Sequence, residues 1–371
     1  MTFWTTVISA LAAAALLGCG GGTGSGAQTQ EEDLAEFESL RAELEGKRKT
    51  FLEGPAQDFQ AAGNLLYWVE AAAGDPRLHS FDQPASVTTD YSFPPFLVAP
   101  SSPNPIDNLN FIGSTSIIAT MNVLDGAQVY AVGKNEEKLG KWTLPAPPYG
   151  QKWWAYGVDG GDVYAAILDD AGKLHLKKWA PGGVESDVAV FDDLIAPQVM
   201  GEFHNFAVSG TTLIFNEGGR IWTAQLGDAK AKWAQNDKEV TSAAYDKAGV
   251  VYNQSADFWQ YDAATDTRVN LTDKIKANEY KLNETFKEAH YPVANTTWCK
   301  SGGKIVYEAN YGMFSYDIAS DTVEPLVLDA RDNSIVYKYP TALDNGTLFV
   351  KGLESQSGAT GADGPTFIVE Q

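Results

Sequence analysis

The residue types that most often bind metals or act as nucleophiles are sparse in this chain. Its 371 residues include two cysteines and four histidines, and no two histidines stand at the spacing of a helical or hairpin metal site. No nucleophile-elbow, phosphate-loop or kinase motif occurs. We therefore assign no catalytic residue, no metal ligand and no cofactor from these types. Four residues are interpreted as scaffold or surface histidines: His79, His175, His204 and His290.

Carboxylates are the abundant reactive groups. Forty-eight acidic against 27 basic residues give a formal net charge of -21, which excludes nucleic-acid binding because phosphate backbones would be repelled, and which favours a cationic partner. Acids recur in or beside the loops that follow one type of predicted strand: Glu70, Asp125, Asp169, Asp170, Glu217, Asp257, Glu308 and Glu354. Two interpretations stay open. In the first, acids occur in every loop simply because the protein is acidic. In the second, these acids surround an opening at one face of the domain and attract Ca²⁺ or a basic segment of a partner.

Two adjacent tryptophans are the aromatic candidates for binding. Trp153 and Trp154 follow a proline-rich connection at residues 145–150, where exposed rings would suit a glycan or a protein hot spot. Packing of these rings against the edge of the next strand group is the alternative.

Cys19 is the residue whose surroundings specify a chemistry most clearly. The apolar run from Val7 to Leu17 is too short to span a bilayer and fits the apolar region of a signal peptide. The run ends in Leu16-Leu17-Gly18-Cys19, which resembles the lipobox of bacterial lipoproteins. The resemblance implies cleavage before Cys19 and attachment of lipid to its thiol and freed amine, giving a multi-chain fatty acyl anchor.

This resemblance implies an order for the N-terminal part of the chain. Residues 1–18 would be a signal peptide and residues 19–30 a lipidated cysteine with a glycine-rich tether. The folded domain would face the periplasm or the cell exterior, held to a membrane by its anchor. An ordinary signal peptide with a chance cysteine is the alternative. Cys299, the second cysteine, is expected to be a small buried hydrophobic residue.

An amphipathic helix is predicted over residues 31–54. Its basis is helical spacing of apolar residues, followed near the end by basic ones: Leu34, Phe37, Leu40, Leu44 and Phe51, then Lys47, Arg48 and Lys49. The helix either packs on the domain or forms a short coiled-coil stalk with another chain.

Past residue 60 the pattern changes to short β-branched and aromatic strands that repeat. Seven copies of one strand type occur, each preceded by turn residues, and their first apolar residues are Leu65, Ile117, Val163, Leu213, Val250, Ile305 and Leu348. They recur on average about every 47 residues, which is the period of a propeller blade. Residues 60–371 are therefore predicted to form an all-β, seven-bladed β-propeller, with a pair of β-sandwiches as the alternative.

Two turns carry a more specific likeness. The stretches beginning at Tyr261-Asp262 and Tyr316-Asp317 resemble the Tyr-Asp-x-x-Thr-Gly-x turn of bacterial propellers, including TolB-like and quinoprotein-like repeats. Asp266 and Asp321 stand where those families often carry glycine. The resemblance implies an architecture and does not imply an activity.

Two insertions interrupt the repeat, at residues 81–110 and 272–292, and the second is expected to be partly helical. Long loops on a rigid scaffold are where binding residues concentrate. The leading interpretation is a non-enzymatic, membrane-anchored lipoprotein that binds another cell-envelope component, either a protein or a glycan. The alternatives are an assembly scaffold and a carbohydrate-active or lyase-type enzyme whose site is built from loop carboxylates.

Overall fold

The computed structural model describes most of the chain from residue 25 onward. Up to residue 278 it covers residues 25–53, 57–62, 64–70, 77–82, 86–92, 108–112, 116–123, 126–133, 138–145, 155–157, 163–168, 174–179, 185–191, 203–209, 212–217, 220–225, 232–235, 240–246, 249–254, 257–262 and 265–278. It also covers residues 283–369 with gaps at 284, 294–295, 331–334, 344 and 354–363. Cys19, Trp153 and Trp154 lie outside the described residues.

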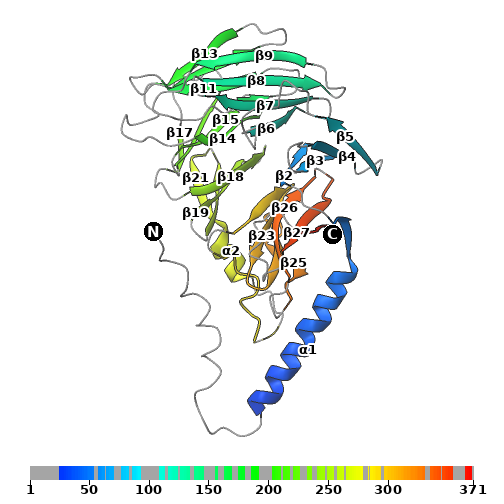
Figure 1. Ribbon diagram of the computed structural model, residues 1–371. Helices are drawn as coiled ribbons and strands as arrows, with labels where there is room; N and C mark the ends of the chain where they lie inside the picture. The colour runs from blue at the N-terminus through cyan, green and yellow to red at the C-terminus, as the bar shows by residue number, and fades with distance from the viewer. Residues whose placement is uncertain are drawn as a thin grey trace, which may run out of the picture.

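Seven four-stranded antiparallel sheets make up the described part of the domain (Figure 1). The first four contain β2 (Gln57–Ala62), β3 (Leu65–Glu70), β4 (Arg77–Asp82) and β5 (Val87–Ser92); β6 (Asn108–Ile112), β7 (Ser116–Val123), β8 (Gly126–Gly133) and β9 (Lys138–Pro145); β10 (Ala155–Gly157), β11 (Val163–Leu168), β12 (Leu174–Trp179) and β13 (Glu185–Phe191); and β14 (Phe203–Ser209), β15 (Thr212–Glu217), β16 (Arg220–Gln225) and β17 (Lys232–Gln235).

The remaining three sheets complete the set. They contain β18 (Val240–Asp246), β19 (Gly249–Gln254), β20 (Asp257–Asp262) and β21 (Thr267–Asn270); β22 (Trp298–Ser301), β23 (Lys304–Ala309), β24 (Gly312–Asp317) and β25 (Thr322–Leu328); and β26 (Val336–Ala342), β27 (Leu348–Leu353) and β28 (Thr366–Val369) with β1 (Arg48–Leu52). Six sheets take their strands consecutively, and the seventh has the order β1-β28-β27-β26.

The seven repeated strands predicted from the sequence all occur, and each has the same place. They are β3, β7, β11, β15, β19, β23 and β27, the second strand in chain order of each sheet if β1 is set aside. The first strands contact one another in succession, β2 with β6, β6 with β10, and so on to β22 with β26, and β26 returns to β2. The neighbour contacts therefore form a closed cycle.

The first described strand, β1, pairs with the last described strand, β28. Strand β1 pairs antiparallel with β28, with Arg48 opposite Val369 and Thr50 opposite Phe367. In Figure 1, α1 (Ser25–Gly46) runs along the outside of the molecule and leads into β1 beside the C-terminal strands. Two strands about 320 residues apart in the sequence therefore lie side by side in the seventh sheet.

The helix predicted over residues 31–54 is wrong at both boundaries. Helix α1 begins at Ser25, so half of the predicted tether is helical, and it ends at Gly46. The basic residues expected to close the helix fall instead at the turn and in β1, and Phe51 lies on a strand. The cause is that pairing with β28 supplies hydrogen bonds that outweigh the local helical pattern. The sheet domain accordingly begins at Arg48 and not at residue 60.

The apolar face predicted for this helix is confirmed, and it packs on the domain. Phe37 and Leu44 are buried, while Leu34 and Leu40 are partly buried against the same cluster, which also includes Phe286. The second helix, α2 (Leu271–Ala277), confirms that the later insertion is partly helical. Neither of these two described helices is both long and apolar enough to cross a bilayer.

The structure of the two turns that resemble bacterial propeller turns shows why each carries aspartate where glycine is common. Asp266 and Asp321 adopt left-handed conformations, with φ of 53° and 54°, which aspartate tolerates better than most residues. The hydroxyl of Tyr261 donates to Oδ1 of Asp266 at 3.0 Å, and that of Tyr316 donates to Oδ1 of Asp321. Burial, together with the bonded carboxylate, raises the pKa of Tyr261 to about 12. The aspartates thus supply an acceptor that glycine could not.

Candidate functional site

The predicted loop acids that the structure describes lie at or just after the C-terminal end of the repeated strand of their own sheet. Glu70 and Glu217 are the last residues of β3 and β15, Glu308 is the next to last residue of β23, and Asp257 begins β20 just after β19. The others, outside the described residues, are Asp125, Asp169, Asp170 and Glu354. Only Asp257 and Glu308 have described side chains. Among the described residues, no group of three or more His, Cys, Asp or Glu could hold a metal ion, and the Ca²⁺ interpretation stays a prediction.

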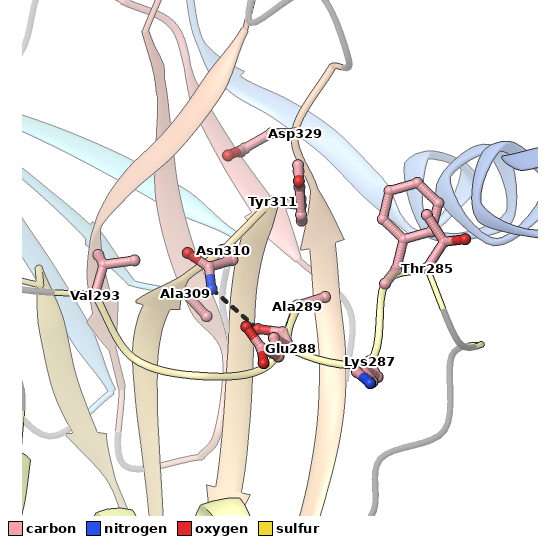
Figure 2. Close-up of a pocket in the computed structure, with 10 residues that line it drawn as sticks. Thr285, Lys287, Glu288, Ala289, Val293, Ala309, Asn310, Tyr311 and Asp329 are labelled. Carbon is pink, nitrogen blue, oxygen red and sulfur yellow. Dashed lines mark hydrogen bonds between the residues drawn. The ribbon is translucent and has the colours of Figure 1, made fainter. Parts of the chain in front are cut away.

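A cavity of about 670 Å³ opens beside one of these acids. It lies between the segment 285–293, which belongs to the second insertion, and the tight turn that joins β23 to β24. Its lining includes Phe286, Glu288, Asn310, Tyr311 and Asp329 (Figure 2). Nδ2 of Asn310 donates to the backbone oxygen of Glu288 at 3.1 Å, and its backbone N–H donates to the carbonyl of Tyr291 at 3.3 Å, so two bonds join the turn to the facing segment.

Asp329 is the acid of this cavity whose pKa is raised. It follows β25, its backbone N–H donates to the carbonyl of Tyr311 at 2.8 Å, and its Oδ1 accepts from the backbone N–H of Tyr337 at 2.9 Å. Burial, reinforced by the nearby charge of Glu308 and opposed by Lys338, raises the pKa of Asp329 to about 7. A carboxyl group with this pKa can both donate and accept a proton near neutral pH.

Glu308, whose charge raises the pKa of Asp329, does not itself line the cavity. Its Oε1 lies 2.9 Å from Nζ of Lys338, and its Oε2 accepts from the hydroxyl of Thr297 at 3.2 Å. The same Thr297 hydroxyl accepts from the backbone N–H of Tyr339 at 3.0 Å. These contacts hold the Glu308 side chain in place near Asp329, where its charge adds to the rise in the pKa of Asp329.

Tyr311 gives the cavity an aromatic rim. Half of the residue is exposed, and its φ of 68° lies in the left-handed region, which a bulky residue rarely adopts. The ring meets Phe286 and Phe37 edge-on, at centroid distances of 5.5 and 6.0 Å. The next residue must be glycine, because a Cβ on Gly312 would lie 2.2 Å from the carbonyl oxygen of Val327.

Helix α1 shapes the far wall of the cavity. The carboxylate of Asp33 accepts from the backbone N–H and the hydroxyl of Thr285, at 3.0 and 2.6 Å, and Nδ2 of Asn283 donates to the Asp33 carbonyl at 2.9 Å. Phe37 stacks on Phe286 at 4.5 Å between ring centroids. The helix therefore holds in place the segment that lines the cavity.

The two histidines with described side chains lie in the interior. His79 stacks on Trp68 at 5.1 Å, and both are buried. His290 is 2% exposed, and burial lowers its pKa. Cys299 was expected to be buried but is only partly buried against the core, and the burial of its thiol raises its pKa to about 12. These groups have the environments of packing residues.

Sequence reasoning named Glu308 and the insertion that contains residues 285–289 of the lining, but missed Asn310, Tyr311 and Asp329. The signal for Tyr311 was present as a tyrosine before glycine in a two-residue turn, where glycine or asparagine is usual. The sequence around Asp329 did not indicate a functional residue. Its raised pKa depends on burial in the fold and on the charge of Glu308, which lies on another strand, β23. Chain position alone also gave no sign that Lys338 would pair with Glu308.

The chain resembles known proteins in structure and not in sequence. No protein-family model and no curated protein matches the chain in sequence. An oligogalacturonate lyase from Vibrio parahaemolyticus is 9% identical, with a TM-score of 0.53 over 87% of this chain and 96% of that one. The Pan2 WD40 domain from Neurospora crassa is 9% identical, with a TM-score of 0.51 over 86% and 90%.

A third similar structure is the extracellular domain of a protein from B. thetaiotaomicron. It is 10% identical, with a TM-score of 0.50 over 86% of this chain, which spans only 39% of that chain's length. At these identities the likeness concerns the fold alone. The prediction of a mostly β, propeller-like fold is confirmed at that level. In fold, this chain is similar to WD40 and other propeller-like proteins.

Proposed function

We propose that this chain is a lipid-anchored, extracytoplasmic seven-bladed β-propeller that binds another component of the cell envelope. The observation that carries the proposal is the lipobox-like Leu16-Leu17-Gly18-Cys19, which lies a few residues before a helix that packs on the sheets. In this arrangement Cys19 is an anchor and not a reactive thiol.

Seven blades are supported by the sheet count and the contacts between sheets. Seven four-stranded sheets have first strands that touch in a closed cycle, and β1 completes the last sheet. A lone blade cannot bury both of its faces, so neighbouring blades are required for stability. The extracellular bacterial domain among the similar structures fits a location outside the cytoplasm.

A binding role is supported by the cavity. Rigid strands fix its turn and Asp329, and the insertion supplies its other wall, which is the usual composition of a small-molecule site.

Changing Cys19→Ser tests the anchor. We expect this variant to take up no radiolabelled fatty acid and to move from the membrane to the soluble fraction, since the serine cannot form the thioether. Cys299→Ala is the matched control, because it alters the other cysteine, and it should keep both label and membrane retention. Labelling of Cys19→Ser at the parent level would refute the anchor.

A carbohydrate-active enzyme is the second candidate function. It is favoured by one observation, the cavity carboxyl group of Asp329 with a pKa of about 7, which suits proton transfer to or from a sugar oxygen or carbon. Any polysaccharide cleavage by the parent protein should then be lost in Asp329→Asn and kept in Asp257→Asn, which alters an acid outside the cavity lining. Reducing-end and unsaturated-product assays distinguish hydrolysis from elimination.

A further inference from the structure

Two tyrosines among the described residues share an unusual combination of properties. Tyr311 and Tyr339 are 50% and 46% exposed, and both have positive φ, of 68° and 54°. Strained conformations of this kind persist where the surroundings enforce them, and they concentrate at binding sites. Only Tyr311 lines the cavity.

The ring of Tyr311 is held as a platform. Phe286 and Phe37 approach it at interplanar angles of 83° and 77°, so their contacts fix the ring plane while half of the residue stays open to solvent. Because Phe286 and Phe37 are themselves buried, this support is rigid. A fixed, half-exposed aromatic ring suits a ligand with a flat apolar face.

Polar groups stand around this platform at the same cavity. Asn310 is the neighbouring turn residue, with its amide tied to the backbone of Glu288 at 3.1 Å. Asp329 is joined through its backbone to Tyr311 and through Oδ1 to Tyr337. A ligand with one apolar face and a rim of hydroxyl groups satisfies both sets of contacts.

The local charges decide between neutral and anionic ligands of that shape. Glu288 and Asp329 line the cavity, the charge of Glu308 acts on Asp329, and the whole chain carries a formal charge of -21. Lys287 is the one basic residue in the lining, and Lys338, which lies outside it, is paired with Glu308. A polyanionic ligand would therefore be repelled.

We propose that this cavity binds a neutral oligosaccharide, with one pyranose ring stacked on Tyr311 and its hydroxyl groups bonded to Asn310 and Asp329. The inference rests on the proposed binding function and names its ligand class. It does not depend on the anchor, because labelling of Cys19 and binding to the cavity are measured separately.

The test is calorimetric titration of the full chain in detergent. The probes are neutral oligomers of glucose and of N-acetylglucosamine, with oligogalacturonate as the anionic comparison. We expect a neutral oligomer to bind, Tyr311→Asn to weaken that binding at least about tenfold, and Tyr311→Phe to change it by less than about twofold. Asparagine is chosen because it accepts a left-handed conformation, so the turn is preserved while the ring is removed.

Tyr339→Asn is the matched control, since it removes an equally exposed, positive-φ tyrosine outside the cavity lining. It should bind the neutral oligomer as the parent does, and thermal melting establishes that each variant is folded. Failure of both neutral oligomers to bind, tighter binding of oligogalacturonate, or equal losses in the Tyr311 and Tyr339 variants would each overturn the proposal.

Discussion

Asp329 shows how a side chain acquires its chemistry from residues remote in sequence. Asp329 is half-buried near Glu308, and the resulting pKa of about 7 depends on the packing of several strands. The sequence indicated Glu308 because it lies at the end of the repeated strand. It could not indicate Asp329, since burial is a property of the folded sheets and not of the local pattern.

This raised pKa makes the stability of the protein depend on pH. Between about pH 4 and pH 7 the folded protein keeps a proton on Asp329 that the unfolded chain has released, so folding binds protons. The free energy of unfolding attributable to this group therefore falls as pH rises through that window, with a slope of up to about 1.4 kcal/mol per pH unit, and is constant above it.

Asp329→Asn should remove this contribution while keeping an oxygen for the N–H of Tyr337. We expect the variant to gain stability relative to the parent as pH rises from 5 to 8, measured by urea unfolding at each pH. Other titrating groups affect both proteins equally, so the difference between the two curves is the readout. Parallel curves would contradict the raised pKa, and Asp257→Asn serves as an acid outside the cavity.

Helix α1 is the element that connects the N-terminal region to the cavity. Its apolar spacing was predictable, and Phe37 and Leu44 are buried as that spacing requires. Its end was not predictable, because the residues after Gly46 become β1 only by pairing with β28. Local pattern carries no information about a partner at the other end of the chain.

Phe37→Ala should destabilise the protein and loosen the cavity wall. The ring is fully buried against Phe286, so we expect a loss of about 3–5 kcal/mol in the free energy of unfolding. Hydrogen exchange should also quicken at residues 285–289. Ser39→Ala, an exposed change on the same helix, should alter neither quantity, and equal effects of the two would argue against this packing.

At the scale of the whole molecule, the repeat was the most predictable feature. Each of the seven predicted strands falls at the same position in its sheet, because inward-facing apolar residues must recur wherever a sheet packs between two neighbours. The manner of closure was not predictable. Phe51, assigned to a helix by its spacing, instead packs between the first sheet and the last.

Phe51→Ala should weaken that junction. The ring lies 5.3 Å from Trp68 and 4.9 Å from Phe81 of the first sheet, and 5.1 Å from Phe349 of the last. We expect a loss of about 2–4 kcal/mol and a broader unfolding transition, since the two sheets can then separate before the rest unfolds. Lys49→Ala, an exposed change in the same strand, should leave the transition sharp. A sharp transition in Phe51→Ala would contradict a role in closure.

The pairing of β1 with β28 also sets the order of events when the protein is made. Synthesis proceeds from the N-terminus, so β1 emerges first and waits without its partner until the final residues of β28, ending at Val369, leave the ribosome. A chain stopped short by a premature termination codon would retain all its earlier strands and still have an open edge, free to pair with another molecule.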